Sequence, residues 1–152
     1  MVKWKILILS LIIVFLVAFI GSLFTRGNTS GEWYDSVKPS ITPPGWIFPI
    51  VWNILFFLIA LSLYFSLTAG KNKIKTKVAI AFGINFLFNI LWSVFYFSMK
   101  NPLLAFFDLI LLLISILYLV IFCWKIDKKA GYLLIPYLAW VSFAGILNWL
   151  SI

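Results

Sequence analysis

Five apolar runs constrain the fold of this chain more than any other feature of its sequence. Each run is about 20 residues long, the length that an α-helix needs to cross roughly 30 Å of membrane hydrocarbon. They cover residues 6–24, 47–67, 78–97, 103–124 and 132–150. Backbone polar groups have no partner in lipid, so an isolated segment satisfies them only as a helix. The sequence therefore predicts an all-α membrane protein, a bundle of five transmembrane helices in a single domain, 1–152.

Composition supports this interpretation. Hydrophobic residues make up 64% of the chain and charged residues 11%, whereas soluble domains carry about 25% charged residues. The first run exceeds the roughly 7–15 apolar residues of a signal peptide, and no small-residue cleavage motif closes it. We therefore expect it to be kept as the first membrane helix.

The placement of Lys and Arg predicts the orientation in the membrane. Of the 12 cations, all but Arg26, Lys38 and Lys100 lie at the N-terminus or in the loops after the second and fourth runs. Cytoplasmic loops are enriched in Lys and Arg, so we expect the N-terminus in the cytoplasm and the C-terminus outside. Because this charge pattern is the usual one for membrane topology, the net charge of +8 gives no reason to expect a nucleic-acid partner.

The chain has no histidine and one cysteine, Cys123. Disulfide pairing, a zinc site and histidine-based catalysis are therefore excluded within one chain, and we expect no metal site. Cys123 itself is expected to be a packed or lipid-facing small hydrophobe.

Polar residues within the runs are the main functional signal. Asp108 is the only acidic or basic residue there, and Asn53, Asn85, Asn89 and Asn148 are amides. At 1.5 Å per residue, all except Asn85 lie in the half of the membrane beneath the long loop between the first two runs. An intramembrane acid is by default functional, although a structural carboxyl held by neighbouring donors is the alternative. For Asn53 and Asn85 we expect hydrogen bonds between helices.

Helical spacing groups several of these residues with aromatic side chains. One face holds Asn85, Asn89 and Trp92, and another holds Tyr137, Trp140, Ala144 and Asn148. An amide that faces lipid costs several kcal/mol, so both faces should point into the bundle. Trp52, Trp92 and Trp140 then either fill the core or line a cavity for a flat aromatic ligand. Pro136 should kink the fifth helix.

The stretch Glu32–Trp46, EWYDSVKPSITPPGW, lies in the long loop and holds three of the six prolines. Each proline restricts its own backbone and that of the residue before it. Trp33, Tyr34 and Trp46 add apolar area that can pack against the bundle. We therefore expect an ordered lid over a ligand cavity, because loops of this length are usually functional or disordered.

Three motifs, in order, are WYDSVKPSITPPGWIFPIVWNILF, NFLFNILWS and LLIPYLAWVSFAGILN. They resemble the TspO/MBR family, which includes tryptophan-rich sensory proteins and the translocator protein or peripheral benzodiazepine receptor. The resemblance implies a five-helix bundle, a homodimer, and a prokaryotic cell membrane as its location. It also implies a cavity beneath the first loop that binds protoporphyrin IX, haem or another hydrophobic small molecule, with no obligatory cofactor. Ile41 departs from the family, many members of which carry an aromatic residue at this position.

The resemblance and the residues within the runs together give the candidate ligand-binding residues. They are Trp33, Tyr34, Pro43, Pro44, Trp52, Asn53, Asn89, Trp92, Asp108, Tyr137, Trp140, Phe143, Ala144 and Asn148. Without histidine, axial ligation of haem iron is disfavoured, so we favour metal-free protoporphyrin as the ligand.

Three functions stay open at this point. The leading hypothesis is a tetrapyrrole-binding membrane protein with a sensory, regulatory or porphyrin-handling role. The second is a porphyrin-degrading enzyme that uses light and oxygen; it rests on the resemblance alone, in which Trp52 and Trp140 match the two tryptophans connected with that breakdown. The third is a transporter of porphyrins or other small hydrophobic ligands. The pairs Ala18–Ser22 and Ala79–Gly83 have the small-residue spacing of helix contacts, either within the chain or in a dimer.

Overall fold

The structure, a computed structural model, describes residues 1–152 and contains only helices. They are α1 (Trp4–Thr25), α2 (Glu32–Val37), α3 (Ile47–Ala69), α4 (Asn72–Ser93), the π-helix η1 (Val94–Ser98), α5 (Pro102–Ile126), α6 (Lys128–Leu133) and α7 (Ile135–Trp149). Five segments are long and apolar enough to cross a membrane: α1, α3, α4 with η1, α5, and α6 with α7. The all-α, five-helix prediction is confirmed.

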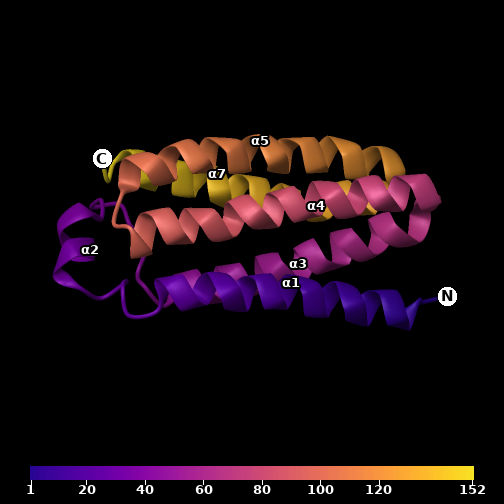
Figure 1. Cartoon of the computed structure of the whole chain (residues 1–152), viewed down its shortest axis with the longest axis horizontal. Helices are drawn as coiled ribbons and strands as arrows, with labels where there is room; N and C mark the ends of the chain where they lie inside the picture. The colour runs from indigo at the N-terminus through magenta and orange to yellow at the C-terminus, as the bar shows by residue number, and fades with distance from the viewer.

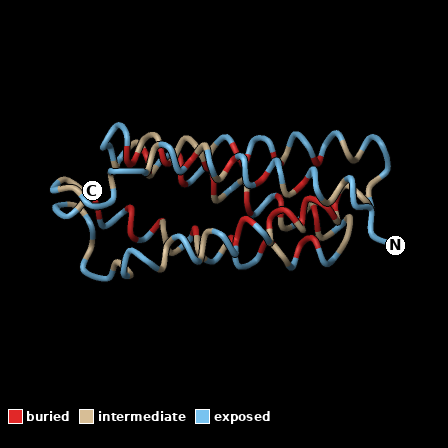
Figure 2. The backbone as a smooth tube through the Cα atoms, turned by 90° about the horizontal axis from the view of Figure 1, so that it is seen from below, coloured by how far each residue is buried: buried red, intermediate tan, exposed pale blue.

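The membrane helices lie side by side along one long axis (Figure 1). α1 packs against α3 and α4, α4 against α5, and α5 against α7. Figure 2 shows the buried residues on the sides of the helices that face one another and the exposed residues on the outside. Since the outer sides are largely apolar, as with Ile12, Ile54 and Ile114, this exposure fits a surface that faces lipid.

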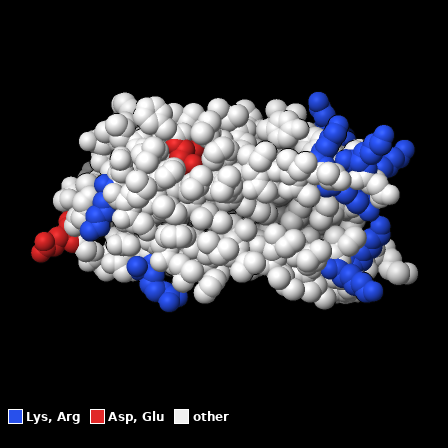
Figure 3. All heavy atoms as spheres, in the orientation of Figure 1, with Lys and Arg blue, Asp and Glu red and all other residues white.

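The two ends of the bundle differ in charge. The chain begins at one end and finishes at the other, and α2 lies at the end that holds the C-terminus (Figure 1). Lys and Arg gather mainly at the N-terminal end (Figure 3), because the N-terminus and the turns after α3 and α5 all lie there. Lys38, in the opposite loop, is paired with Asp35 at 2.7 Å.

The turns at the end of the bundle where α2 lies are built from residues suited to them. α1 ends at Thr25, and Gly27 follows with a positive φ of 79°, a conformation that glycine adopts without strain. α5 begins with Pro102, and the Asn101 side chain accepts a hydrogen bond from the Leu104 amide at 3.0 Å. A proline in the first turn and an asparagine cap are the usual start signals of a helix.

Helices pack closely toward the N-terminal end of the bundle. Cys123 is fully buried there, so it is packed and does not face lipid. The Ser62 hydroxyl of α3 donates to the carbonyl of Ala130 in α6 at 2.8 Å. A methyl group on Gly131 would lie 2.8 Å from Cβ of Trp124, so α5 and α6 are in close contact at this point.

Two helices depart from the predicted runs. The third run starts at residue 78 in the sequence, but α4 already begins at Asn72, because its lysines are compatible with a helix that leaves the membrane. The fifth run is broken at Leu134, two residues before Pro136. The predicted kink at Pro136 is thus present as a break that separates α6 from α7.

Candidate functional site

A cavity of about 720 Å³ lies in the half of the bundle nearest α2. α1, α3, α4, η1, α5, α7 and the loop that contains α2 all contribute to its walls. Its volume is within the roughly 300–1,000 Å³ of sites for small molecules. The cavity also lies in the half of the bundle in which the sequence places all of the intramembrane polar residues except Asn85.

More than half of the candidate ligand-binding residues line this cavity. They are Tyr34, Trp52, Asn53, Asn89, Trp92, Trp140, Ala144 and Asn148. Both predicted helix faces point inward: Asn85 is fully buried, Asn89 is 9% exposed and Asn148 is 1% exposed. The expectation that these amides avoid lipid is confirmed.

The remaining candidates lie around the cavity without lining it. They are Trp33, Pro43, Pro44, Asp108, Tyr137 and Phe143. The Trp33 ring packs on Tyr96 with the ring centroids 5.7 Å apart. Phe143 lies beside Trp140 and lines a different hollow. Tyr137 is behind the wall, where its ring and that of Trp52 form an edge-type pair with the centroids 6.3 Å apart.

Asp108 is buried in α5, next to Leu109, which lines the cavity. Its Oδ2 atom is buried and has no hydrogen-bond partner. Asp108 therefore does not line the cavity. The alternative of a structural carboxyl held by neighbouring hydrogen-bond donors does not apply to its Oδ2 atom.

Aromatic rings from α3, α4, η1 and α7 line the cavity. On α3, Trp52 stacks on Phe56 with the centroids 5.3 Å apart. On α4 and η1, Trp92 stacks on Tyr96 at 5.1 Å. Trp140 of α7 packs edge-on against Phe48 at 5.8 Å. Trp52, Trp92 and Trp140 all line the cavity, and all three also pack against the buried core.

A chain of hydrogen bonds fixes the amides of α4. The Asn89 amide donates to the Tyr137 hydroxyl at 3.1 Å, and this hydroxyl donates to Oδ1 of Asn85 at 3.1 Å. The Asn85 amide then donates to the Ser115 hydroxyl of α5 at 2.9 Å. Asn85 therefore bonds to other helices, as predicted. The chain leaves the carbonyl oxygen of Asn89 free to accept a hydrogen bond inside the cavity.

Asn148 orients a second part of the wall. Its Oδ1 atom accepts a hydrogen bond from the indole nitrogen of Trp92 at 2.9 Å, and its amide donates to the carbonyl of Pro102 at 2.8 Å. One side chain of α7 therefore holds both a cavity tryptophan of α4 and the start of α5.

Asn53 differs from the prediction. Its amide donates to the carbonyl of Pro49 in its own helix at 2.8 Å, and the residue is exposed. The expected hydrogen bond between helices is wrong. Pro49 lies four residues earlier, so an amide at residue 53 reaches this carbonyl without a partner helix.

The mouth of the cavity, at the end of the bundle that holds α2, is polar, and the sequence did not reveal its hydroxyl groups. Arg26, Thr29, Ser30 and Thr42 line it, and Oγ1 of Thr42 is buried without a hydrogen-bond partner. The only ion pair of the structure joins Lys38 to Asp35, so Arg26 has no carboxylate partner. Hydroxyl groups in a loop of mixed composition carry no periodic pattern that would have identified them.

Tyr34 brings a hydroxyl to the same mouth from α2. Burial raises the pKa of the Tyr34 phenol, and the neighbouring Asp35 carboxylate raises it further. The phenol therefore keeps its proton and remains a hydrogen-bond donor at neutral pH.

The π-helix η1 adds Tyr96 and Phe97 to the lining. A π-helix has i→i+5 hydrogen bonds, and such segments are frequent at functional sites. The wider turn brings Phe97 beside Trp92, five residues earlier, with the ring centroids 5.7 Å apart. Helical spacing of three and four residues does not identify this pair.

Comparison with known proteins agrees with this architecture. The model of the TspO/MBR family matches residues 10–151. A tryptophan-rich protein TspO from Chlorobaculum tepidum is 41% identical over 133 residues, which is 87% of this chain and 84% of that protein.

Two further relatives extend the range of organisms. A tryptophan-rich protein TspO from Archaeoglobus fulgidus is 36% identical over 146 residues, which is 93% of this chain and 92% of the relative. The translocator protein of Bos taurus is 30% identical over 135 residues, which is 86% of this chain and 79% of that protein. This chain is an integral membrane protein that belongs to the TspO/MBR family.

Proposed function

We propose that the protein binds a tetrapyrrole, with metal-free protoporphyrin IX as the favoured ligand, in the cavity beneath the loop. The observation that carries this proposal is the convergence of Trp52, Trp92 and Trp140 on one cavity of about 720 Å³. A porphyrin ring is flat and apolar, and indole rings offer stacking area for such a molecule. Aromatic walls with a few polar groups are typical of small-molecule sites.

The polar groups of the cavity suit the edge of the same ligand. Porphyrins of this type carry carboxylates on one edge, and Arg26 lines the outer mouth without a carboxylate partner. The hydroxyl groups of Thr42 and Tyr34 are donors beside it. The ligand would then place its carboxylates toward the membrane surface and its apolar ring among the tryptophans.

The metal-free ligand is favoured by the residue types present. Haem iron in proteins is usually held by His, Cys, Met or Tyr. The chain has no histidine, Cys123 is buried outside the cavity and Met99 does not line it. Only the phenols of Tyr34 and Tyr96 remain in the lining as possible iron ligands. The lining provides aromatic and amide contacts that suit the ring itself.

The role of binding is proposed to be sensory, regulatory or porphyrin-handling. In the proposed orientation the N-terminus and its lysines face the cytoplasm, and the cavity mouth faces outward. α2 and the loop contact η1 through Trp33 and Tyr34, so a ligand that fills the cavity would alter the contacts of this outer lid. A homodimer is part of the proposal. Of the two pairs with small-residue spacing, Ala79 and Gly83 on α4 are exposed, so this pair is open to a second copy of the chain. The other pair, Ala18 and Ser22 on α1, lines the cavity.

A titration with protoporphyrin IX tests the binding proposal. We expect saturable binding by the wild-type protein, followed by the absorption band of the porphyrin. The double variant Trp52→Leu, Trp140→Leu should bind about tenfold more weakly or worse, because each lost aromatic contact is worth about 0.5–1.5 kcal/mol beyond its area.

Trp46→Leu is the matched control for this titration. Trp46 is 68% exposed and does not line the cavity, so its replacement should leave the affinity unchanged. Equal affinity of the double variant and the wild type would contradict the proposed site.

A second candidate function is the breakdown of protoporphyrin in light and oxygen. The observation in its favour is that Trp52 and Trp140 line the same cavity, so both indoles would contact a ligand held there. Matched light and dark arms of the same titration separate the two functions: binding alone predicts equal bleaching of porphyrin with and without the protein.

A further inference from the structure

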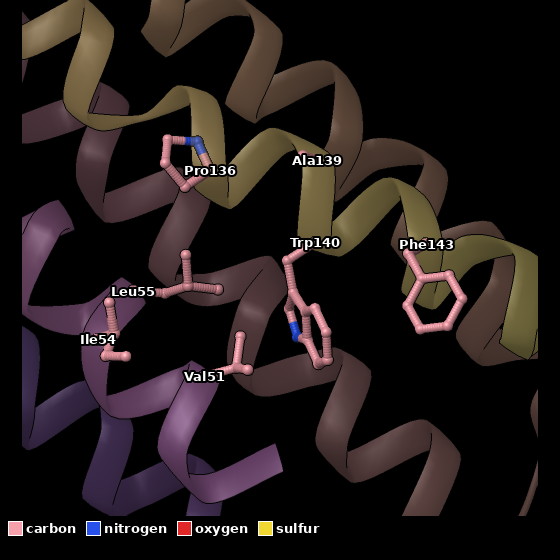
Figure 4. A pocket seen from close by; sticks show the side chains of 7 residues that line it. All are labelled: Val51, Ile54, Leu55, Pro136, Ala139, Trp140 and Phe143. Atoms are coloured by element: carbon pink, nitrogen blue, oxygen red, sulfur yellow. The ribbon is translucent and has the colours of Figure 1, made fainter. Parts of the chain in front are cut away.

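A second hollow, of about 470 Å³, opens between α3 and α7 (Figure 4). Its α3 wall is Val51, Ile54 and Leu55, and its α7 wall is formed by Pro136, Ala139, Trp140 and Phe143. No charged or amide side chain contributes to it. We call this hollow the α3–α7 groove.

The α3–α7 groove lies at the depth of the membrane hydrocarbon. Its α3 residues are about 6–12 Å from the start of that helix at 1.5 Å per residue. Ile54 is 56% exposed, and Pro136 and Ala139 are also exposed. An open, apolar hollow at this depth is in contact with lipid chains rather than water.

The break between α6 and α7 explains why the groove exists. α6 packs against α3, held by the hydrogen bond from Ser62 to the Ala130 carbonyl. After the break at Leu134, α7 packs mainly against α5 and has little contact with α3. The two helices therefore separate from Pro136 onward.

Trp140 is the only residue that lines both the groove and the cavity. Its ring lies 5.8 Å from Phe48, which lines the cavity, and 5.7 Å from Phe143, which lines the groove. On α3, Val51 and Leu55 face the groove, while Trp52 and Phe56, the next residue in each case, face the cavity. In Figure 4 the Trp140 ring extends from α7 into the space toward α3. One indole thus separates the lipid side from the cavity.

We propose that the α3–α7 groove is the side entrance through which an apolar ligand dissolved in the membrane reaches the cavity, with the Trp140 ring as its gate. This inference rests on the proposed function, since it concerns the route to that site. The ligand class is a membrane-dissolved, flat, mainly apolar molecule, because the groove offers no partner for a charge. Rotation of one side chain suffices to join the two hollows, whereas the outer mouth is covered by α2 and a loop restricted by prolines.

Blocking the groove chemically tests the inference. In a Cys123→Ala background, Ala139→Cys places a thiol on the exposed wall of the groove, where a bulky maleimide can be attached before the protein is returned to lipid vesicles. Protoporphyrin IX is then added from vesicles, and its association and dissociation rates are measured. We expect attachment to lower both rates about tenfold or more and to leave the equilibrium affinity within about twofold, since a gate affects rates and not the bound state.

Two further variants keep this test decisive. Ile114→Cys, on α5, carries the same maleimide; Ile114 is 60% exposed and lines neither the groove nor the cavity, so both rates should stay unchanged. Val51→Trp fills the groove from the α3 wall without a reagent and should slow both rates in the same way.

The outcomes separate the inference from the proposed function. The side entrance is overturned if labelled Ala139→Cys and Val51→Trp both bind protoporphyrin with normal affinity and with unchanged association and dissociation rates. The cavity would then be a site that fills from the outer mouth. If these variants lose affinity but associate with the ligand as fast as the wild type, the groove is part of the binding site, and the side entrance is again overturned. Absence of saturable binding by the wild-type protein would overturn both proposals.

Discussion

Tyr137 joins α7 to α4 through a single hydroxyl group. It accepts a hydrogen bond from Asn89 and donates one to Asn85, both at 3.1 Å, and its side chain is 1% exposed. Within a membrane bundle such groups have no water to replace a lost partner. The hydroxyl therefore fixes the position of the Asn89 side chain at the cavity wall.

Tyr137→Phe is predicted to destabilise the bundle by about 0.6–2 kcal/mol, the range measured for hydrogen bonds between membrane helices. Thermal unfolding in detergent measures this loss. Tyr118→Phe is the control, because Tyr118 is 56% exposed. The same melting temperature for both variants would mean that the chain of hydrogen bonds contributes nothing to stability.

At the residue scale, the sequence predicted the positions of the amide side chains best where helical periodicity and the cost of desolvation both favour an inward-facing position. Asn89 and Asn148 lie on inward faces, and both line the cavity. Asn53 was wrongly assigned, because an amide can satisfy itself on the carbonyl four residues earlier in its own helix. Thr42 was missed because no pattern marks a loop hydroxyl whose position depends on the folded backbone.

At the scale of elements, short interruptions of the helices shape the site. The π-helix η1 brings Phe97 beside Trp92, and the break at Leu134 separates α7 from α3. The break follows from Pro136, which the sequence marks directly. η1 has no such marker, and the short helix α2 was expected only as an ordered loop, since six residues are too few for a periodic pattern.

Close contact between α5 and α6 gives a prediction at the same scale. A methyl group on Gly131 would lie 2.8 Å from Cβ and 2.9 Å from Cα of Trp124. Gly131→Ala should therefore force the two helices apart and lower the free energy of unfolding by about 1–3 kcal/mol. Unfolding in mixed micelles measures the change.

Gly83→Ala is the matched control for that helix contact. No atom lies within 4 Å of a methyl group added at Gly83, and alanine favours a helix over glycine by up to about 1 kcal/mol. This variant should be as stable as the wild type or more so. If Gly131→Ala is equally tolerated, the α5–α6 contact is not as close as described.

At the scale of the whole molecule, the bundle divides into a packed half and a hollow half. Cys123 and Gly131 lie in the packed half, near the end where Lys and Arg gather (Figure 3). Trp52 and Asn148 lie in the hollow half, under α2 and its loop. The sequence predicted this division from the depth of polar residues along each apolar run. It could not predict the α3–α7 groove, which depends on how α6 and α7 are oriented after their break.

The central claim is that the cavity itself holds the ligand, and filling it is the most direct test. Ala144 lines the cavity in α7, the helix that also carries Trp140, and Ala69 is exposed at the end of α3 and lines no part of the cavity. Protoporphyrin affinity is measured for Ala144→Phe and for Ala69→Phe, with helix content and melting temperature checked for both. We predict that Ala144→Phe weakens binding by at least about tenfold, because its ring occupies the ligand's space, while Ala69→Phe binds like the wild type. Wild-type affinity in a folded Ala144→Phe variant would contradict the claim.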